Sequence, residues 1–164
     1  MNQAAAQLGE GALSAEALQR ANVHPESGLA TDYLNHFNEV VMLLEMLDDM
    51  PDMAGEVLAW SPCGYAEHFK RTKYAGAETV IAAYAAAPRA LRAHFETLVA
   101  ALDDILIDAQ AKVRAGDCAG AAALAAEEVA PLLAAARAAI AGRIEGEDVD
   151  DRAAAQAGVD ALFG

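Results

Sequence analysis

The sequence predicts an all-α fold: a helical bundle or a long antiparallel helical hairpin, followed by a flexible C-terminal docking helix. Hydrophobic residues make up 55% of the 164 positions, yet only 5% are aromatic, and alanine supplies much of the remainder. Alanine has the highest helix propensity, whereas the β-branched and aromatic residues that favour strands are sparse. Apolar side chains also recur every three or four positions, the period of an amphipathic helix. We therefore expect helices and no strands.

The N-terminal half predicts a series of helices interrupted by proline and glycine. An alanine-rich helix over residues 3–22 ends at the sequence His-Pro-Glu-Ser-Gly. Thr31 is placed to cap a longer helix from Asp32 to about Asp49, because its hydroxyl can accept a hydrogen bond from a free amide of the first turn. One face of this helix should turn to the core through Leu34, Phe37, Val41 and Leu44. Shorter helices are expected over residues 53–60, 65–71 and 77–86.

The C-terminal half predicts a helical hairpin. Residues 89–114 form the longest periodic segment, and Gly116 suits the left-handed position that follows a helix. A second alanine-rich helix is expected over residues 119–144, with a kink near Pro131. Two long helices joined by so short a turn pack antiparallel, and an alanine-rich hairpin could also form a homodimer. The chain thus divides into a helical domain, an acidic linker and a C-terminal peptide, over residues 1–143, 144–152 and 153–164.

Charge and composition restrict the partners. The chain has 25 acidic and 11 basic residues, giving a net charge of -14, and such a field repels nucleic acids and anionic lipids. We therefore expect no nucleic-acid and no membrane partner. No unbroken apolar stretch has the ~18 residues of a membrane span, and the N-terminus lacks the basic and apolar regions of a secretion signal. These observations predict a cytoplasmic protein.

The last dozen residues, AAAQAGVDALFG, form a short amphipathic segment behind an acidic, glycine-containing spacer. On a helix its three large apolar side chains share one face, and so short a helix is unstable in water unless a groove receives it. The segment resembles the peptide by which the flagellar switch protein FliM and the chemotaxis phosphatase CheZ bind the response regulator CheY. The matching positions are Gln156, Val159, Asp160, Leu162 and Phe163. The alternative is a C-terminal helix that folds back on the core.

A polar stripe marks the start of the helix that follows Thr31. Spacings of three, four and seven place four hydrogen-bonding side chains on one face: Asp32, Asn35, His36 and Glu39. Residues 32–41 resemble the catalytic helix segment of CheZ, Asp-Phe-Gln-Asp-Leu-Thr-Gly-Gln-Val-Ile. Asn35 then falls on the catalytic acid of that family and Glu39 on its catalytic glutamine, so acid and amide have exchanged places. The alternative is a solvated helix face with first-turn capping.

The two resemblances together imply a CheZ-like chemotaxis phosphatase of two-component signalling and flagellar motility. The receiver supplies Mg²⁺ and a lysine, so the chain needs no cofactor of its own. Asn35 would orient the attacking water, Glu39 would pair with the receiver's lysine, and Asp32 and His36 would support this face. CheC and CheX also use a glutamate and an asparagine on one helix. The rival interpretation is a non-catalytic adaptor or scaffold that localises or sequesters a receiver domain through the same tail.

Three other groups of residues could form a functional site. His36 and Glu39 are three positions apart, but the pattern occurs once, so we expect no metal site. The aromatic region from Trp60 to Tyr74 could line a ligand pocket, and a small core under a loop is the preferred interpretation. Acidic residues of the long helix predict a solvated face, and part of this group is a second location for a water-positioning site. The group consists of Asp103, Asp104 and Asp108 with the amide of Gln110.

Overall fold

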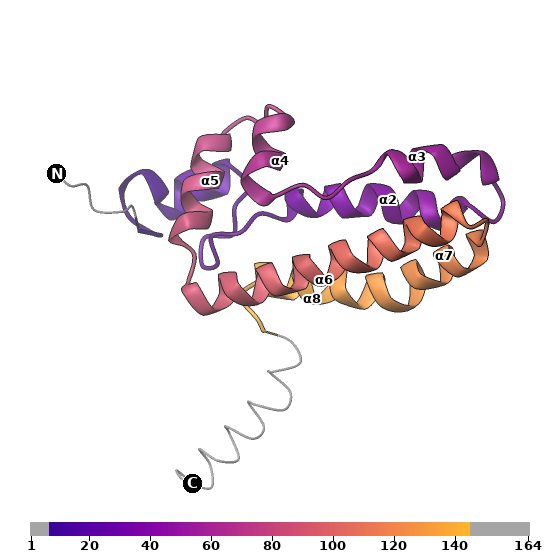
Figure 1. Cartoon of the computed structure of the whole chain (residues 1–164). Helices are drawn as coiled ribbons and strands as arrows, with labels where there is room; N and C mark the ends of the chain where they lie inside the picture. Colours follow the sequence, from indigo (N-terminus) through magenta and orange to yellow (C-terminus); the bar gives the residue numbers. More distant parts are fainter. Residues whose placement is uncertain (1–6, 145–164) are drawn as a thin grey trace, which may run out of the picture.

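A computed structural model describes residues 7–144 of the chain. Within this range every regular element is helical, which confirms the all-α prediction (Figure 1). The C-terminal peptide, and the acidic linker after Ile144, lie outside the described residues. The α-helices are α1 Ala15–Arg20, α2 Asn35–Met46, α3 Ala54–Ala59, α4 Tyr65–Arg71, α5 Ala77–Ala86, α6 Arg89–Arg114, α7 Cys118–Leu124 and α8 Ala130–Ile140.

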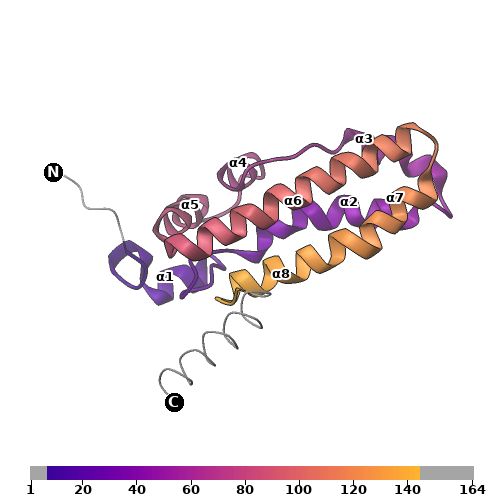
Figure 2. The same ribbon diagram turned by 60° about the horizontal axis from the view of Figure 1, so that its bottom comes forward.

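The long hairpin is the scaffold of the molecule. Helix α6 runs antiparallel to α7 and α8, and both views show them side by side (Figures 1 and 2). Gly116 closes the turn with a φ of +84°, the left-handed conformation that favours glycine. Asp117 then caps α7, because its carboxylate accepts a hydrogen bond of 2.8 Å from the amide of Gly120.

Helix α2 packs against this hairpin, and α3 packs on both α2 and α6. The four apolar side chains predicted to face the core are all buried: Leu34, Phe37, Val41 and Leu44. At the other end of the molecule, α4 and α5 stand beside the start of α6 (Figure 1). The opposite face of α2 is therefore the one available for polar side chains.

The predicted cap at Thr31 is wrong. A 3-10 turn, Thr31–Leu34, precedes α2, and Ala30 rather than Thr31 occupies the cap position. The carbonyl of Ala30 accepts the amide of Tyr33 at 3.4 Å, which starts the turn, while the amide of Ala30 is taken by the hydroxyl of Tyr65 at 2.8 Å. Asp32 consequently lies in this turn, and α2 itself begins at Asn35.

The alanine-rich helix predicted over residues 119–144 is interrupted by a π-helical turn, Ala125–Val129. Pro131 stands in the first turn of α8. Because proline has no amide hydrogen and its ring clashes with the carbonyl four residues earlier, the regular α-helical ladder cannot continue through this point. The wider π-turn accommodates the proline in place of the expected kink.

The stretch Cys118–Ile140 has a length and a mean hydropathy, 1.4, compatible with a membrane span, although no span was expected from the sequence. Of its most apolar window, 22% is buried. One face of this stretch is buried in the hydrophobic core: Ala121, Ala125, Val129, Leu133 and Ala136. Packing against α6 and α2 therefore accounts for the apolar residues on that face.

Candidate functional site

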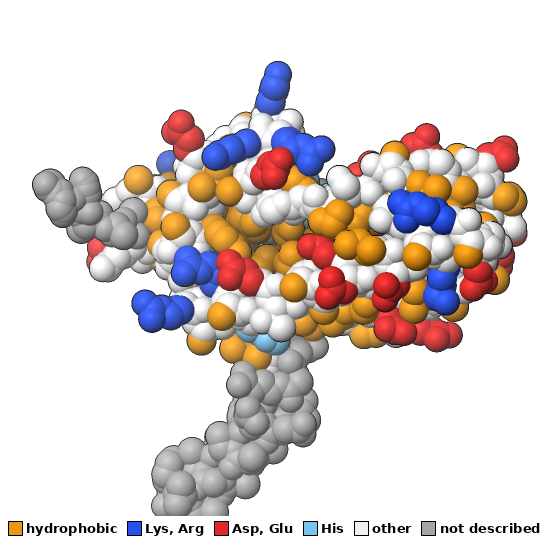
Figure 3. All heavy atoms as spheres, viewed as in Figure 1, with side chains coloured by type: hydrophobic (Ala, Val, Ile, Leu, Met, Phe, Trp, Pro, Cys, Tyr) orange, Lys and Arg blue, Asp and Glu red, His pale blue; other side chains and the backbone are white. Residues whose placement is uncertain are grey.

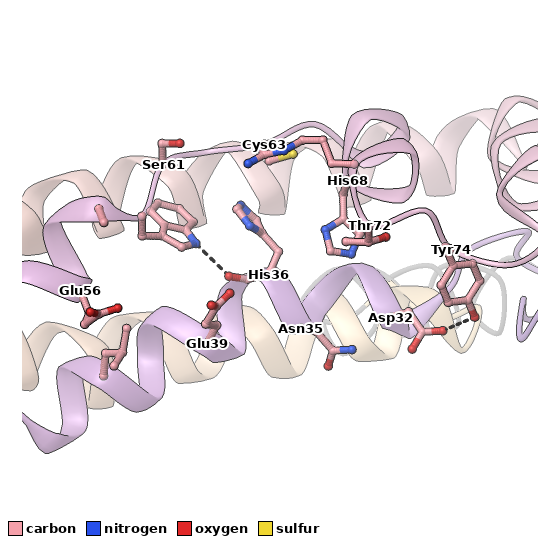
Figure 4. A pocket seen from close by; sticks show the side chains of 14 residues that line it. Asp32, Asn35, His36, Glu39, Glu56, Ser61, Cys63, His68, Thr72 and Tyr74 are labelled. Atoms are coloured by element: carbon pink, nitrogen blue, oxygen red, sulfur yellow. Dashed lines mark hydrogen bonds between the residues drawn. The ribbon is translucent and has the colours of Figure 1, made fainter. Parts of the chain in front are cut away.

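A cavity of about 620 Å³ lies along the polar face of α2. We call it the first cavity. Helices α3 and α4 and the segment between them form its other walls (Figure 4). All four residues of the predicted polar stripe line it: Asp32, Asn35, His36 and Glu39. The structure thus brings the stripe together with side chains from a distant part of the sequence.

Asn35 and Glu39 are the most accessible members of the stripe. Both are exposed, and neither side chain makes a hydrogen bond to another residue of the range 7–144. They stand one helical turn apart on α2 (Figure 4), a spacing that lets two side chains act on one group. An amide and a carboxylate with free hydrogen-bonding capacity are therefore exposed at this face.

Asp32 has a structural partner instead. Its carboxylate accepts a hydrogen bond of 2.6 Å from the hydroxyl of Tyr74 (Figure 4) and another of 2.9 Å from the side-chain amide of Asn22. Burial and this bond to a carboxylate raise the pKa of Tyr74 to about 12. Asp32 therefore ties the 3-10 turn to the loop after α4 and to the loop after α1.

His36 lies in the wall of the first cavity between two aromatic rings. It stacks on Trp60, with ring centroids 4.8 Å apart, and on Tyr33 at 6.0 Å, and the indole of Trp60 donates a hydrogen bond of 2.8 Å to its backbone carbonyl (Figure 4). Burial lowers the pKa of His36 to about 4, with smaller contributions from His68 and Arg71. The imidazole is therefore neutral at neutral pH and acts as an aromatic surface.

The charges around the first cavity are separated. Arg71 lines it at α4 and forms no ion pair with any described residue, whereas Glu39 and Glu56 line it at α2 and α3. Lys70 and Lys73 flank Arg71 and are exposed, and Figure 3 shows basic side chains gathered over α4. A protein of net charge -14 thus has a basic patch, Lys70, Arg71 and Lys73, directly beside its polar stripe.

Among the described residues, no three His, Cys, Asp or Glu side chains converge closely enough to hold a metal ion. His36 and His68, the two imidazoles nearest to each other in the first cavity, have ring centroids 6.1 Å apart. Burial also lowers the pKa of His68. The site therefore offers hydrogen bonds, aromatic surface and fixed charges.

The aromatic region from Trp60 to Tyr74 has two roles. Tyr65 and Phe69 are buried in the core, as the preferred interpretation expected, whereas Trp60, His68 and Tyr74 line the first cavity. The sequence could not separate these roles, because α4 is too short to show a clear amphipathic period. The fold does so by laying one face of α4 on α5 and turning the other to α2.

The second predicted location for a water-positioning site is wrong in one respect. Gln110 is buried, and its amide donates hydrogen bonds to the carbonyls of Val57 at 2.9 Å and Trp60 at 2.7 Å. This amide fixes the end of α3, so it has no donor left for water. Asp104 and Asp108 are exposed as expected, but Asp103 is half-buried, and its Oδ1 is fully buried.

Comparison of the chain with protein-family models, with curated proteins and with solved structures found no match. Gln156, Val159, Asp160, Leu162 and Phe163, the predicted receiver-binding positions, lie outside the described residues. The tail sequence and the chemistry of the first cavity are therefore the features that bear on function.

Proposed function

We propose that this protein binds a CheY-type response regulator through its C-terminal segment and promotes hydrolysis of the receiver's aspartyl phosphate through Asn35 and Glu39. The observation that carries the proposal is the pair itself. An amide and a carboxylate that bond to no other side chain or backbone group among the described residues stand one turn apart, exposed, on a helix segment whose sequence resembles a receiver phosphatase. The tail, which resembles a receiver-binding peptide, supplies the second argument.

The chemistry needs little from this chain. The receiver brings the phosphorylated aspartate, Mg²⁺ and a lysine, so a helper protein accelerates hydrolysis by positioning groups. The amide of Asn35 can both donate to and accept from an attacking water. The carboxylate of Glu39, which no described cation pairs with, is free to hold the lysine. The neutral imidazole of His36 adds no charge that would compete for Glu39.

The basic patch supports an acidic docking surface on the receiver. Lys70, Arg71 and Lys73 account for three of the 11 basic residues of the chain and adjoin the first cavity through Arg71. A strongly acidic protein that approaches another acidic surface needs such a local reversal of charge. Raising the salt concentration should therefore slow the association.

The decisive experiment measures the lifetime of a phosphorylated CheY-type receiver with and without the protein. Asn35→Ala should slow stimulated phosphate release about 100-fold, the scale of losing one positioned catalytic group. Glu39→Ala should slow it as well, and Glu39→Gln should not restore it, because pairing with a lysine needs the charge. Asn38→Ala and Glu45→Ala are the matched controls, since both residues lie on α2 outside the first cavity.

The adaptor remains the second candidate, because the tail resembles a binding peptide whereas Asn35 and Glu39 reverse the order of acid and amide. Wild-type protein that binds the phosphorylated receiver without shortening the phosphate's lifetime would reject the phosphatase and support the adaptor. Absence of any binding, at low salt and with the tail intact, would reject both.

A further inference from the structure

A second cavity, of about 530 Å³, lies between α6 and the segment that leads into α4. It shares Cys63 with the first cavity and none of the residues proposed to act on a receiver. Figure 3 shows the hollow between α4 and α6, with hydrophobic side chains in its floor and acidic ones at its edge. Four aromatic residues line it: Tyr33, Tyr65, Tyr84 and Phe95.

All charged residues that line the second cavity are acidic. They are Glu67 from α4, with Glu96 and Asp103 from α6. No lysine, arginine or histidine is among its lining residues. Glu96 accepts a hydrogen bond of 2.5 Å from the hydroxyl of Tyr84, so its charge is partly satisfied.

Asp103 has no such partner. Its Oδ1 is buried and finds no hydrogen bond among the described residues. Burial, followed by repulsion from Asp104, raises the pKa of Asp103 to about 6, which leaves it mostly ionised at neutral pH. The other titratable groups facing the second cavity are Tyr33, Cys63, Tyr65, Glu67, Tyr84 and Glu96. None of these neutralises a carboxylate.

Arg92 of α6, which lies beside Tyr84, is engaged elsewhere. Arg92 donates hydrogen bonds to the carbonyls of Tyr84 and Ala85 at 3.3 and 3.0 Å, and its guanidinium lies 5.9 Å from the centre of the Tyr84 ring. A half-buried carboxylate without a counter-charge costs free energy of folding. Such a group in an aromatic cleft is typical of a functional site, because a ligand can supply what the fold does not.

We propose that the second cavity binds an organic cation: an ammonium group on an apolar chain, paired with Asp103 and packed against the partly exposed side chains of Tyr84 and Val99. Tyr33, Tyr65 and Phe95 back the cavity from the core and are at most 6% exposed. Charge complementarity selects a cation, since all the ionisable residues that line the cavity are neutral or negative. The ring of Tyr84 beside Val99 selects an apolar body next to the charge. Two kinds of ligand have such an ammonium group on an apolar chain: a free amine and the lysyl side chain of another protein.

Titration of the full chain with three probes, followed by NMR chemical shifts, tests the proposal. The probes are n-hexylammonium, uncharged n-hexanol of the same length, and lysine blocked at both ends as an amide. Hexylammonium should bind about tenfold tighter than hexanol at pH 7.5, the scale of one hydrogen bond to a charged group. This preference should shrink toward pH 5 as Asp103 takes up a proton.

Asp103→Asn should remove the preference for hexylammonium, while Asp108→Asn, at an exposed position of α6 outside the second cavity, should leave it within about twofold. Equal binding by hexylammonium and hexanol in the wild type would overturn the proposal without any variant, as would absence of binding by both. Binding of blocked lysine as tight as that of hexylammonium would support a lysyl side chain as the ligand. Much weaker binding of blocked lysine would support a free amine.

Discussion

Asp103→Asn should stabilise this protein. The carboxylate of Asp103 is half-buried and has no hydrogen-bond partner at Oδ1 among the described residues. Asparagine keeps the shape of the side chain and removes the charge, so the variant resembles the wild type with Asp103 protonated. The substitution relieves both causes of the raised pKa, the burial of charge and the repulsion from Asp104.

The magnitude follows from linkage. The pKa of Asp103 rises from 3.8 to about 6. Each pKa unit corresponds to about 1.4 kcal/mol, so ionised Asp103 lowers the free energy of unfolding at high pH by about 3 kcal/mol. Because the group is half-exposed, solvent screening reduces the gain to about 1–2 kcal/mol. A raised pKa in the folded state stabilises the fold below pH 3.8, and this stability is lost as the pH rises through about 6. The advantage of the variant should therefore grow from pH 5 to pH 7 and level off above.

Urea denaturation followed by circular dichroism measures this difference. The measurements start at pH 5, which lies above the isoelectric point of about 4.4. Asp108→Asn, at an exposed position of the same helix, is the control and should change the free energy of unfolding by less than about 0.5 kcal/mol. A variant at Asp103 that is less stable than the wild type at pH 8, or whose advantage does not depend on pH, would refute the reasoning.

Three further predictions concern the tail and the wall of the first cavity. Deletion of residues 153–164 should abolish receiver binding and leave the melting temperature of the helical domain unchanged, whereas a fall of several degrees would indicate a helix folded back on the core. Phe163→Ala should weaken receiver binding, measured by calorimetry, about 10- to 100-fold through loss of buried apolar area, and a larger effect of Asp160→Ala would contradict an apolar groove. Gln110→Ala should lower the free energy of unfolding in urea by about 1–3 kcal/mol, because it leaves the carbonyl of Trp60 without its donor and removes one of the two donors to the carbonyl of Val57.

Much of the fold could be predicted because local signals agree with the tertiary structure. Tyr65–Arg71, Ala77–Ala86 and Arg89–Arg114 begin and end at the residues that the sequence predicts. Proline, glycine and the apolar period all point to the same boundaries there. The predicted helix start is wrong where a contact with a residue far away in the sequence determines it. Tyr65 takes the amide of Ala30, and no local signal near Thr31 indicates this bond.

The polar stripe could be predicted as a shared face, because helical periodicity fixes which side chains point together. The walls opposite the stripe could not. They come from residues 56–74, and their placement depends on hydrogen bonds between side chains and backbone carbonyls far apart in sequence. The partial burial of Asp103 could not be predicted for the same reason. Its sequence context, beside Asp104 and near Asp108, is that of a solvated face, and only the packing of α6 against the segment before α4 buries it.

The wall that the two cavities share is held by side chains rather than by regular structure. Residues 60–64 form no helix, yet Gln110 donates to the carbonyl of Trp60, the hydroxyl of Tyr33 donates to the carbonyl of Cys63 at 2.6 Å, and the indole of Trp60 donates to the carbonyl of His36. These bonds fix both ends of the segment to α6, to the 3-10 turn and to α2. The polar stripe on α2 and the second cavity beside α6 therefore lie on either side of one segment, whose position depends on side-chain hydrogen bonds from α6, the 3-10 turn and Trp60.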